Sequence, residues 1–136
     1  MPHELIFAPM GVLALLTFVV LGFIPIRRFR AVGSGQIEAG DFKLGESARV
    51  PPEVAIPNRN YMNLLELPML FYVVGLMYYV ADKVDAVVLT LAWTYVALRI
   101  VHSVIHIGYN NVRHRLIPFA ISNFLLIAIW VKFFIP

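Results

Sequence analysis

Four long apolar stretches dominate this sequence and limit what it can fold into. They cover about residues 5–26, 60–81, 86–109 and 117–136. About 20 apolar residues in a helix cross the hydrocarbon core of a bilayer, and a helix satisfies its backbone hydrogen bonds internally, as lipid requires. We therefore predict an all-α membrane protein in which four transmembrane helices form one bundle, with residues 1–136 as a single domain.

The composition agrees with this class and excludes several functions. Hydrophobic residues make up 60% of the chain and charged residues 14%, whereas about a quarter of a typical soluble domain is charged. The chain has no cysteine, which excludes disulfides, thiolate metal ligands and a cysteine nucleophile. Any thiol chemistry would therefore use the thiol of a ligand. The net charge of +3 does not indicate a nucleic-acid partner, because the basic residues gather at the ends of the spans.

The basic residues predict the orientation in the membrane. Arg27, Arg28 and Arg30 directly follow the first span, and a second basic segment covers residues 110–116. Lys and Arg are enriched in cytoplasmic loops. We therefore expect the N-terminus to lie outside, and residues 27–58 and 110–116 to lie in the cytoplasm.

The long connection at residues 27–58 allows two interpretations. It is rich in glycine and proline, which break helical periodicity, and long connections are typically either disordered or functional. It is thus either a mobile linker or a flap over a site at the membrane surface. Shortly after it, Pro68 lies in the second turn of the second span, where a proline removes a backbone donor. We expect a bend near Glu66.

The second and third spans each carry a polar stripe on one helical face. The first stripe contains Arg59, Asn63 and Glu66, which lie within about 60° of one another on a helix. The second contains Arg99, His102 and His106, spaced by three and four residues. The second span starts where the third one ends, so the stripes should meet at a similar depth.

A buried arginine in a membrane span is costly unless it is paired. Glu66 is the expected partner of Arg99, and this ion pair could be purely structural, with Asn63 and His102 as hydrogen-bonding groups between helices. The remaining positive charge exceeds what one glutamate neutralises, which favours an anionic ligand. The groups in excess are Arg59, Arg113, Arg115, His102, His106 and His114.

Two other kinds of site are less consistent with the sequence. His102 and His106 have a spacing that allows a shared metal, with Glu66 as a third ligand. However, the adjacent arginines would repel a cation, so we expect no metal. Ser103 with a neighbouring histidine could suggest a hydrolase, but no nucleophile elbow surrounds this serine.

The order of these motifs resembles the MAPEG family, membrane-associated proteins in eicosanoid and glutathione metabolism. The resemblance rests on Arg59-x-x-x-Asn63-x-x-Glu66-x-Pro68, on Arg99-x-x-His102 in the third span, and on Arg115 before the fourth. It covers nearly the whole chain, as a divergent member of bacterial type. It implies a homotrimer that binds glutathione between neighbouring subunits near the cytoplasmic face.

The resemblance also implies roles for individual residues. In catalytic members an arginine stabilises the glutathione thiolate, which attacks or reduces a lipophilic substrate, and Arg115 matches that arginine. We predict Arg115 and His106 as catalytic residues. The predicted glutathione ligands are Arg59, Asn63, Glu66, Arg99, His102 and Arg113.

Two positions depart from the eicosanoid-type members. Met62 stands where they have an arginine, and His106 stands where they have a tyrosine. The leading prediction is a glutathione-dependent transferase or peroxidase for lipophilic electrophiles at the cytoplasmic side of the membrane. One alternative is a non-catalytic integral membrane protein of the same fold that binds a lipid or a partner. Another is a different enzyme class that uses His106 as a general base.

Overall fold

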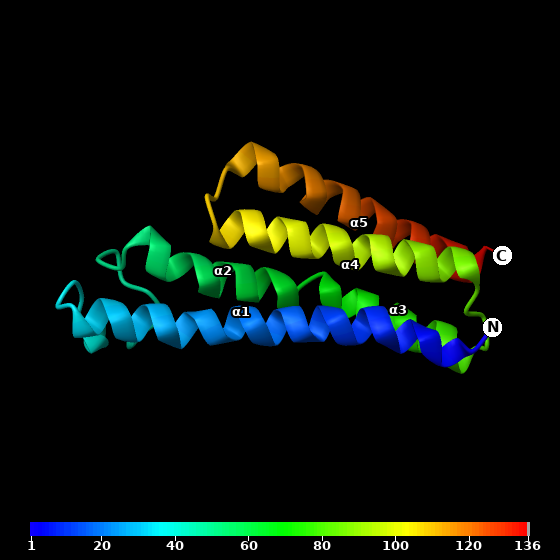
Figure 1. The fold of residues 1–136 in the computed structure, drawn as a ribbon, viewed down its shortest axis with the longest axis horizontal. Coiled ribbons are helices and arrows are strands. Elements are labelled where there is room, and N and C mark those ends of the chain that lie inside the picture. Colours follow the sequence, from blue (N-terminus) through cyan, green and yellow to red (C-terminus); the bar gives the residue numbers. More distant parts are fainter. Residues whose placement is uncertain (136) are drawn as a thin grey trace.

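The computed structural model describes residues 1–135, and within that range it contains helices and no strand (Figure 1). The elements are η1 (His3–Ile6), α1 (Phe7–Gly33), η2 (Ala39–Phe42), α2 (Pro52–Leu65), α3 (Pro68–Val80), α4 (Ala86–Ile107) and α5 (Val112–Phe134). Four segments are long and apolar enough to cross a membrane, namely η1 with α1, α2 with α3, α4, and α5. The predicted four-span membrane bundle is confirmed.

The helices run roughly parallel or antiparallel along one long axis (Figure 1). α1 extends along the whole bundle, and α2 and α3 follow one another beside it. α4 and α5 form an antiparallel pair on the other side. Both termini and the α3–α4 turn lie at one end, while the long connection and the α4–α5 turn lie at the other. The two basic segments of the sequence therefore meet at the same end of the bundle.

The core forms where α1, α3 and α4 pack together. Leu13, Phe71 and Tyr95 are buried there, and the rings of Phe71 and Tyr95 stack with centroids 4.7 Å apart. A Cβ atom at Gly75 would lie 2.8 Å from the sulfur of Met10, so this glycine permits the close approach of α1 and α3. A second, smaller cluster of buried apolar residues, Ala31, Ile37 and Val54, lies at the charged end.

The start of α4 is held by a carboxylate. The side chain of Asp85 accepts a hydrogen bond from the backbone N–H of Val88 at 2.7 Å and pairs with Lys132 of α5 at 2.9 Å. These two interactions hold the pKa of the Asp85 carboxyl below its usual range. Asp85 thus caps one helix and ties it to the next.

The break in the second span lies where Pro68 predicted it. α2 ends at Leu65, Glu66 leaves the helical conformation with ψ of −102°, and α3 begins at Pro68. The predicted bend near Glu66 is confirmed. At this break the backbone carbonyl of Asn63 accepts a hydrogen bond from Arg99 at 3.2 Å.

The helices extend into the segment that was expected to be a polar connection. α1 continues past the expected end at Ile26 to Gly33, and α2 starts at Pro52 instead of near residue 60. Pro57 lies inside α2 and leaves the carbonyl of Glu53 without its helical donor. The guanidinium of Arg27 donates to that carbonyl at 2.7 Å, which explains how this proline is tolerated.

The fourth helix also begins earlier than expected. α5 starts at Val112 instead of near residue 117, because the side chain of Asn111 accepts hydrogen bonds from the backbone N–H groups of Arg113 and His114. Arg113 and Arg115 are thus on the first turn of a helix and not in a loop. The last residue of the predicted span, Pro136, lies outside the described residues.

The rest of the connection, residues 34–51, is folded onto the ends of α1 and α2. Ile37 is buried against Ala31 and Val54, and Arg28 lies 4.5 Å from the ring of Phe42. Asp41 accepts hydrogen bonds from the backbone N–H of Glu38 and from the hydroxyl of Ser47, and these bonds lower the pKa of its carboxyl. The contacts favour a fixed cap on the bundle over a free linker.

Candidate functional site

The two polar stripes meet between α2 and α4. The guanidinium of Arg99 donates to the side-chain oxygen of Asn63 and, at 3.2 Å, to its backbone carbonyl. One turn nearer the helix end, the hydroxyl of Ser103 donates to the side-chain oxygen of Asn60 at 3.3 Å. Asn63 of the predicted stripe therefore faces α4, whereas Arg59 and Glu66 of the same stripe are exposed.

The expected ion pair between Glu66 and Arg99 is wrong. Arg99 is fully buried and bonded to Asn63, with its guanidinium 5.5 Å from the ring of Phe119. Glu66 is exposed. The physical reason is the cost of burying a carboxylate: the neutral side chain and the backbone carbonyl of Asn63 accept the hydrogen bonds of the buried guanidinium instead.

Several buried polar atoms along this contact have no hydrogen-bond partner within residues 1–135. They are Asn60 Nδ2, Tyr95 Oη, Arg99 Nε and Nη1, His102 Nε2 and His106 Nδ1. Buried polar groups in proteins are nearly always hydrogen-bonded, to protein or to water. This region therefore has spare donors and acceptors for a polar ligand or for water.

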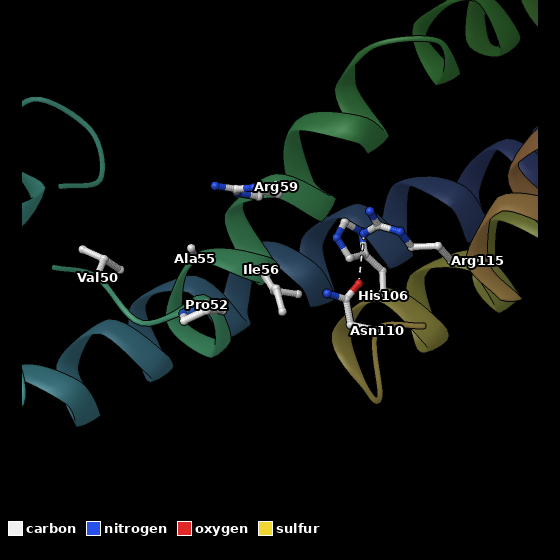
Figure 2. A pocket seen from close by; sticks show the side chains of 8 residues that line it. All are labelled: Val50, Pro52, Ala55, Ile56, Arg59, His106, Asn110 and Arg115. Atoms are coloured by element: carbon white, nitrogen blue, oxygen red, sulfur yellow. Dashed lines mark hydrogen bonds between the residues drawn. The ribbon is translucent and has the colours of Figure 1, made fainter. Parts of the chain in front are cut away.

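Two cavities open beside the stripes, between α2, α4 and α5. The outer one has a volume of about 400 Å³ and is lined by Val50, Pro52, Ala55, Ile56, Arg59, His106, Asn110 and Arg115 (Figure 2). The inner one has about 230 Å³ and is lined by Arg59, Asn63, His102, His106, Val112, Arg115, Leu116 and Phe119. Arg59, His106 and Arg115 line both, so we treat the two cavities as one site.

Arg115 is held at its side chain and at its backbone. Its Nη1 donates to the side-chain oxygen of Asn110 at 3.0 Å, the bond drawn in Figure 2. Its backbone carbonyl lies 2.9 Å from Nδ1 of His102. Asn110 has a positive φ of 46° in the α4–α5 turn, a conformation that asparagine adopts more readily than most residues. The turn thus presents the guanidinium to the cavity.

The site is electropositive. Two arginines, Arg59 and Arg115, line it, and no Asp or Glu is among the residues that line either cavity. His102 and His106 add two imidazoles whose ring centroids are 5.6 Å apart. Arg115 is half-buried and Arg59 is exposed, so Arg115 attracts an anion more strongly than a cation surrounded by water would. The arrangement suits a ligand with carboxylate groups.

The structure brings five of the eight predicted site residues together. These are Arg59, Asn63, His102, His106 and Arg115. The other three line neither cavity in the described chain. Arg99 lies behind Asn63, and Glu66 and Arg113 are exposed.

Some lining residues were not predicted as part of the site. Asn110 extends the polar stripe of α4 by one turn, which is visible in the sequence, but its bond to Arg115 depends on the turn conformation. Val50 comes from the end of the long connection and Pro52 from the first residue of α2, and both form part of the outer wall. No sequence motif marks them.

Comparison with known protein families identifies a match. The model of the MAPEG family matches residues 6–135, nearly the whole chain. No curated protein and no solved structure matches the sequence. The matched range includes all the residues that line the two cavities, as well as the helix break at Glu66 and the arginine buried behind Asn63.

Proposed function

Because this chain belongs to the MAPEG family, we propose that it binds glutathione in the site between α2, α4 and α5 and either conjugates the glutathione thiol to its substrate or uses that thiol to reduce it. The substrates are lipophilic electrophiles, and the site faces the cytoplasm. One observation carries the proposal: Arg59 and Arg115 both line the two cavities, without a carboxylate among the lining residues. The chain is an integral, multi-pass membrane protein of this family.

The chemistry of glutathione fits these side chains. It is a tripeptide with two carboxylates, one ammonium group and one thiol. A guanidinium can bind a carboxylate through two parallel hydrogen bonds, which is the role we propose for Arg59. The amide of Asn63 faces the inner cavity and can bind a backbone group of the tripeptide.

Arg115 is proposed to stabilise the thiolate. A nearby cation lowers the pKa of a thiol and increases the fraction present as the nucleophilic thiolate. His106 lines the cavity beside Arg115 and is proposed to accept the thiol proton. The sulfur then forms a bond to an electrophilic carbon, and the leaving group departs with the electrons of the broken bond.

The lipophilic substrate is proposed to arrive from the bilayer along α5. Leu116 and Phe119 line the inner cavity. Leu116 and the neighbouring Ile117 are exposed on the outer surface of that helix. The inner cavity thus has a cationic wall on one side and an apolar wall on the other, which matches a reaction between a charged peptide and an apolar molecule.

We further propose a homotrimer with glutathione between neighbouring subunits. Glu66 and Arg113 are exposed and line neither cavity in the single chain. In a trimer they can complete a site together with a neighbour, and Glu66 would bind the ammonium group. Native mass spectrometry of the protein in detergent should then show a trimer.

A titration tests the central proposal. Purified protein in neutral detergent is titrated with glutathione in a calorimeter, and the thiolate of the bound ligand is followed by ultraviolet absorbance. Saturable binding with a thiolate signal is the expected result. S-methylglutathione, which cannot ionise at sulfur, is the control and should bind without that signal. Absence of binding at millimolar glutathione would contradict the proposal.

The second candidate function is non-catalytic binding of a lipid or partner by the same fold. It is favoured by the pairs Arg99–Asn63 and Ser103–Asn60, which join α2 and α4 without any ligand. In that case these polar residues serve packing, and the loss of Arg115 has little consequence. Glutathione binding without a thiolate signal would support this candidate over the enzyme.

Asn110 provides a further prediction. In Asn110→Gly the left-handed backbone is still easily adopted, but Arg115 loses its side-chain partner. We expect the turnover number for glutathione conjugation to fall by roughly threefold to tenfold, on the scale of one hydrogen bond, while the affinity for glutathione changes little. Kinetics at saturating glutathione measures this. Equal losses in affinity and turnover would instead indicate a general collapse of the turn.

A further inference from the structure

A third cavity lies at the charged end of the bundle, apart from the candidate site. It has a volume of about 610 Å³ and lies between the end of α1, the start of α2 and the end of α4. The polar residues and glycine that line it are Arg27, Arg30, Ser34, Gln36, Glu53 and Gly108. It shares no lining residue with the two cavities of the glutathione site, and the proposed reaction does not use it.

The cavity carries two arginines and a single carboxylate. Arg27 donates to the backbone carbonyls of Glu53 at 2.7 Å and Ile107 at 3.4 Å, which orient it without removing its charge. In the described part of the chain, neither Arg27 nor Arg30 forms an ion pair. Glu53 is the one acidic residue of the lining. Two cations and one anion leave a net positive charge.

An exposed apolar strip lies directly below these arginines on α1. Val19, Phe23 and Ile26 are exposed by 51%, 37% and 54%. On a helix they lie within about 100° of Arg27 and Arg30. The guanidinium of Arg27 is 5.9 Å from the ring of Phe23. One face of α1 therefore changes from apolar to cationic at this point.

The boundary between the apolar strip and the two arginines of α1 lies at the depth of the lipid headgroups. The apolar stretch of residues 5–26 is long enough to cross the hydrocarbon core, at about 1.5 Å per residue and a core of roughly 30 Å. Arg27 and Arg30 follow it directly. They come within reach of lipid phosphates while the strip below them stays among acyl chains.

We propose that this cavity binds the phosphate of an anionic phospholipid, with one acyl chain lying along Val19, Phe23 and Ile26. Arginine pairs with phosphate through charge-assisted and often bidentate hydrogen bonds. Basic pockets between transmembrane helices on the cytoplasmic side are suited to anionic headgroups. The hydroxyl of Ser34 and the amide of Gln36, which also line the cavity, can bind further headgroup oxygens.

The test uses the full chain, freed of lipid in neutral detergent. Mixed micelles supply either phosphatidylglycerol or a diacylglycerol with the same acyl chains, and native mass spectrometry counts bound lipid. Phosphatidylglycerol should bind and the diacylglycerol should not. Arg30→Gln should weaken the binding of phosphatidylglycerol about tenfold, on the scale of one charge-assisted hydrogen bond. Arg30→Lys should restore part of it.

Lys43→Gln is the matched control, because Lys43 is exposed, directly follows η2 in the connection and does not line the cavity. It should bind phosphatidylglycerol like the wild type. An equal loss in both variants, or equal binding of the diacylglycerol, would overturn the proposal. A third arm titrates the lipid-free protein with inorganic phosphate: if free phosphate binds as tightly as phosphatidylglycerol, the acyl chain contributes nothing and the lipid assignment is wrong.

Discussion

Arg115→Ala is expected to lower kcat/KM for conjugation of glutathione roughly 100-fold, the scale of losing a preformed electrostatic stabiliser. In the structure its guanidinium lines both cavities and is oriented by Asn110. The developing negative charge on sulfur would then lack its nearest fixed cation. The thiolate absorbance of the bound ligand should disappear in the same variant.

Two further variants separate the charge of Arg115 from general effects. Arg115→Lys keeps a cation but not the planar guanidinium that donates to Asn110, so it should retain an intermediate activity. Arg49→Ala removes an exposed arginine of the connection that lines neither cavity and should behave like the wild type. Unchanged turnover in Arg115→Ala would contradict the role in thiol activation.

Asn63→Leu is expected to destabilise the protein by about 3 kcal/mol, because it removes the side-chain acceptor of the buried Arg99 guanidinium and leaves only the backbone carbonyl. Arg99 is fully buried, and Asn63 supplies both the side-chain and the backbone oxygen that it binds. The change can be measured as the unfolding free energy in a detergent titration with dodecyl sulfate, monitored by circular dichroism.

The double variant Asn63→Leu/Arg99→Met provides the control for this pair. It removes the buried charge together with its partner, so it should be more stable than Asn63→Leu alone, despite carrying one more substitution. Glu66→Gln should leave the stability nearly unchanged, since Glu66 is exposed and does not pair with Arg99. If Glu66→Gln strongly lowered the unfolding free energy while Asn63→Leu left it unchanged, Arg99 would depend on Glu66 and not on Asn63.

The helices were predictable in kind and approximate place, because the evidence for them is local. The apolar stretches are long enough to span a bilayer, and Pro68 marks the break after Leu65 whatever surrounds it. Helix ends were less predictable. α2 begins at Pro52 with Pro57 inside it because Arg27, distant in sequence, donates to the carbonyl of Glu53, and a proline pattern alone does not reveal such a donor.

The candidate site was predicted as residue types on faces, but not as contacts. The spacing of Arg99, His102 and His106 placed them on one side of α4, and the structure shows them buried on that side. The partner of Arg99 could not be read from spacing. Glu66 is exposed, and the neutral side chain of Asn63, not the carboxylate, bonds to the buried arginine.

The sequence by itself determined the membrane class, the four spans, the bend and the family, since hydropathy, proline and motif order are properties of short segments. The tertiary structure decided which polar groups pair, how the turn at Asn110 aims Arg115, and that the long connection folds back against α1 and α2. The physical reason is that each of these depends on distances between segments far apart in the chain. Packing of the helices sets those distances, and no local pattern contains them.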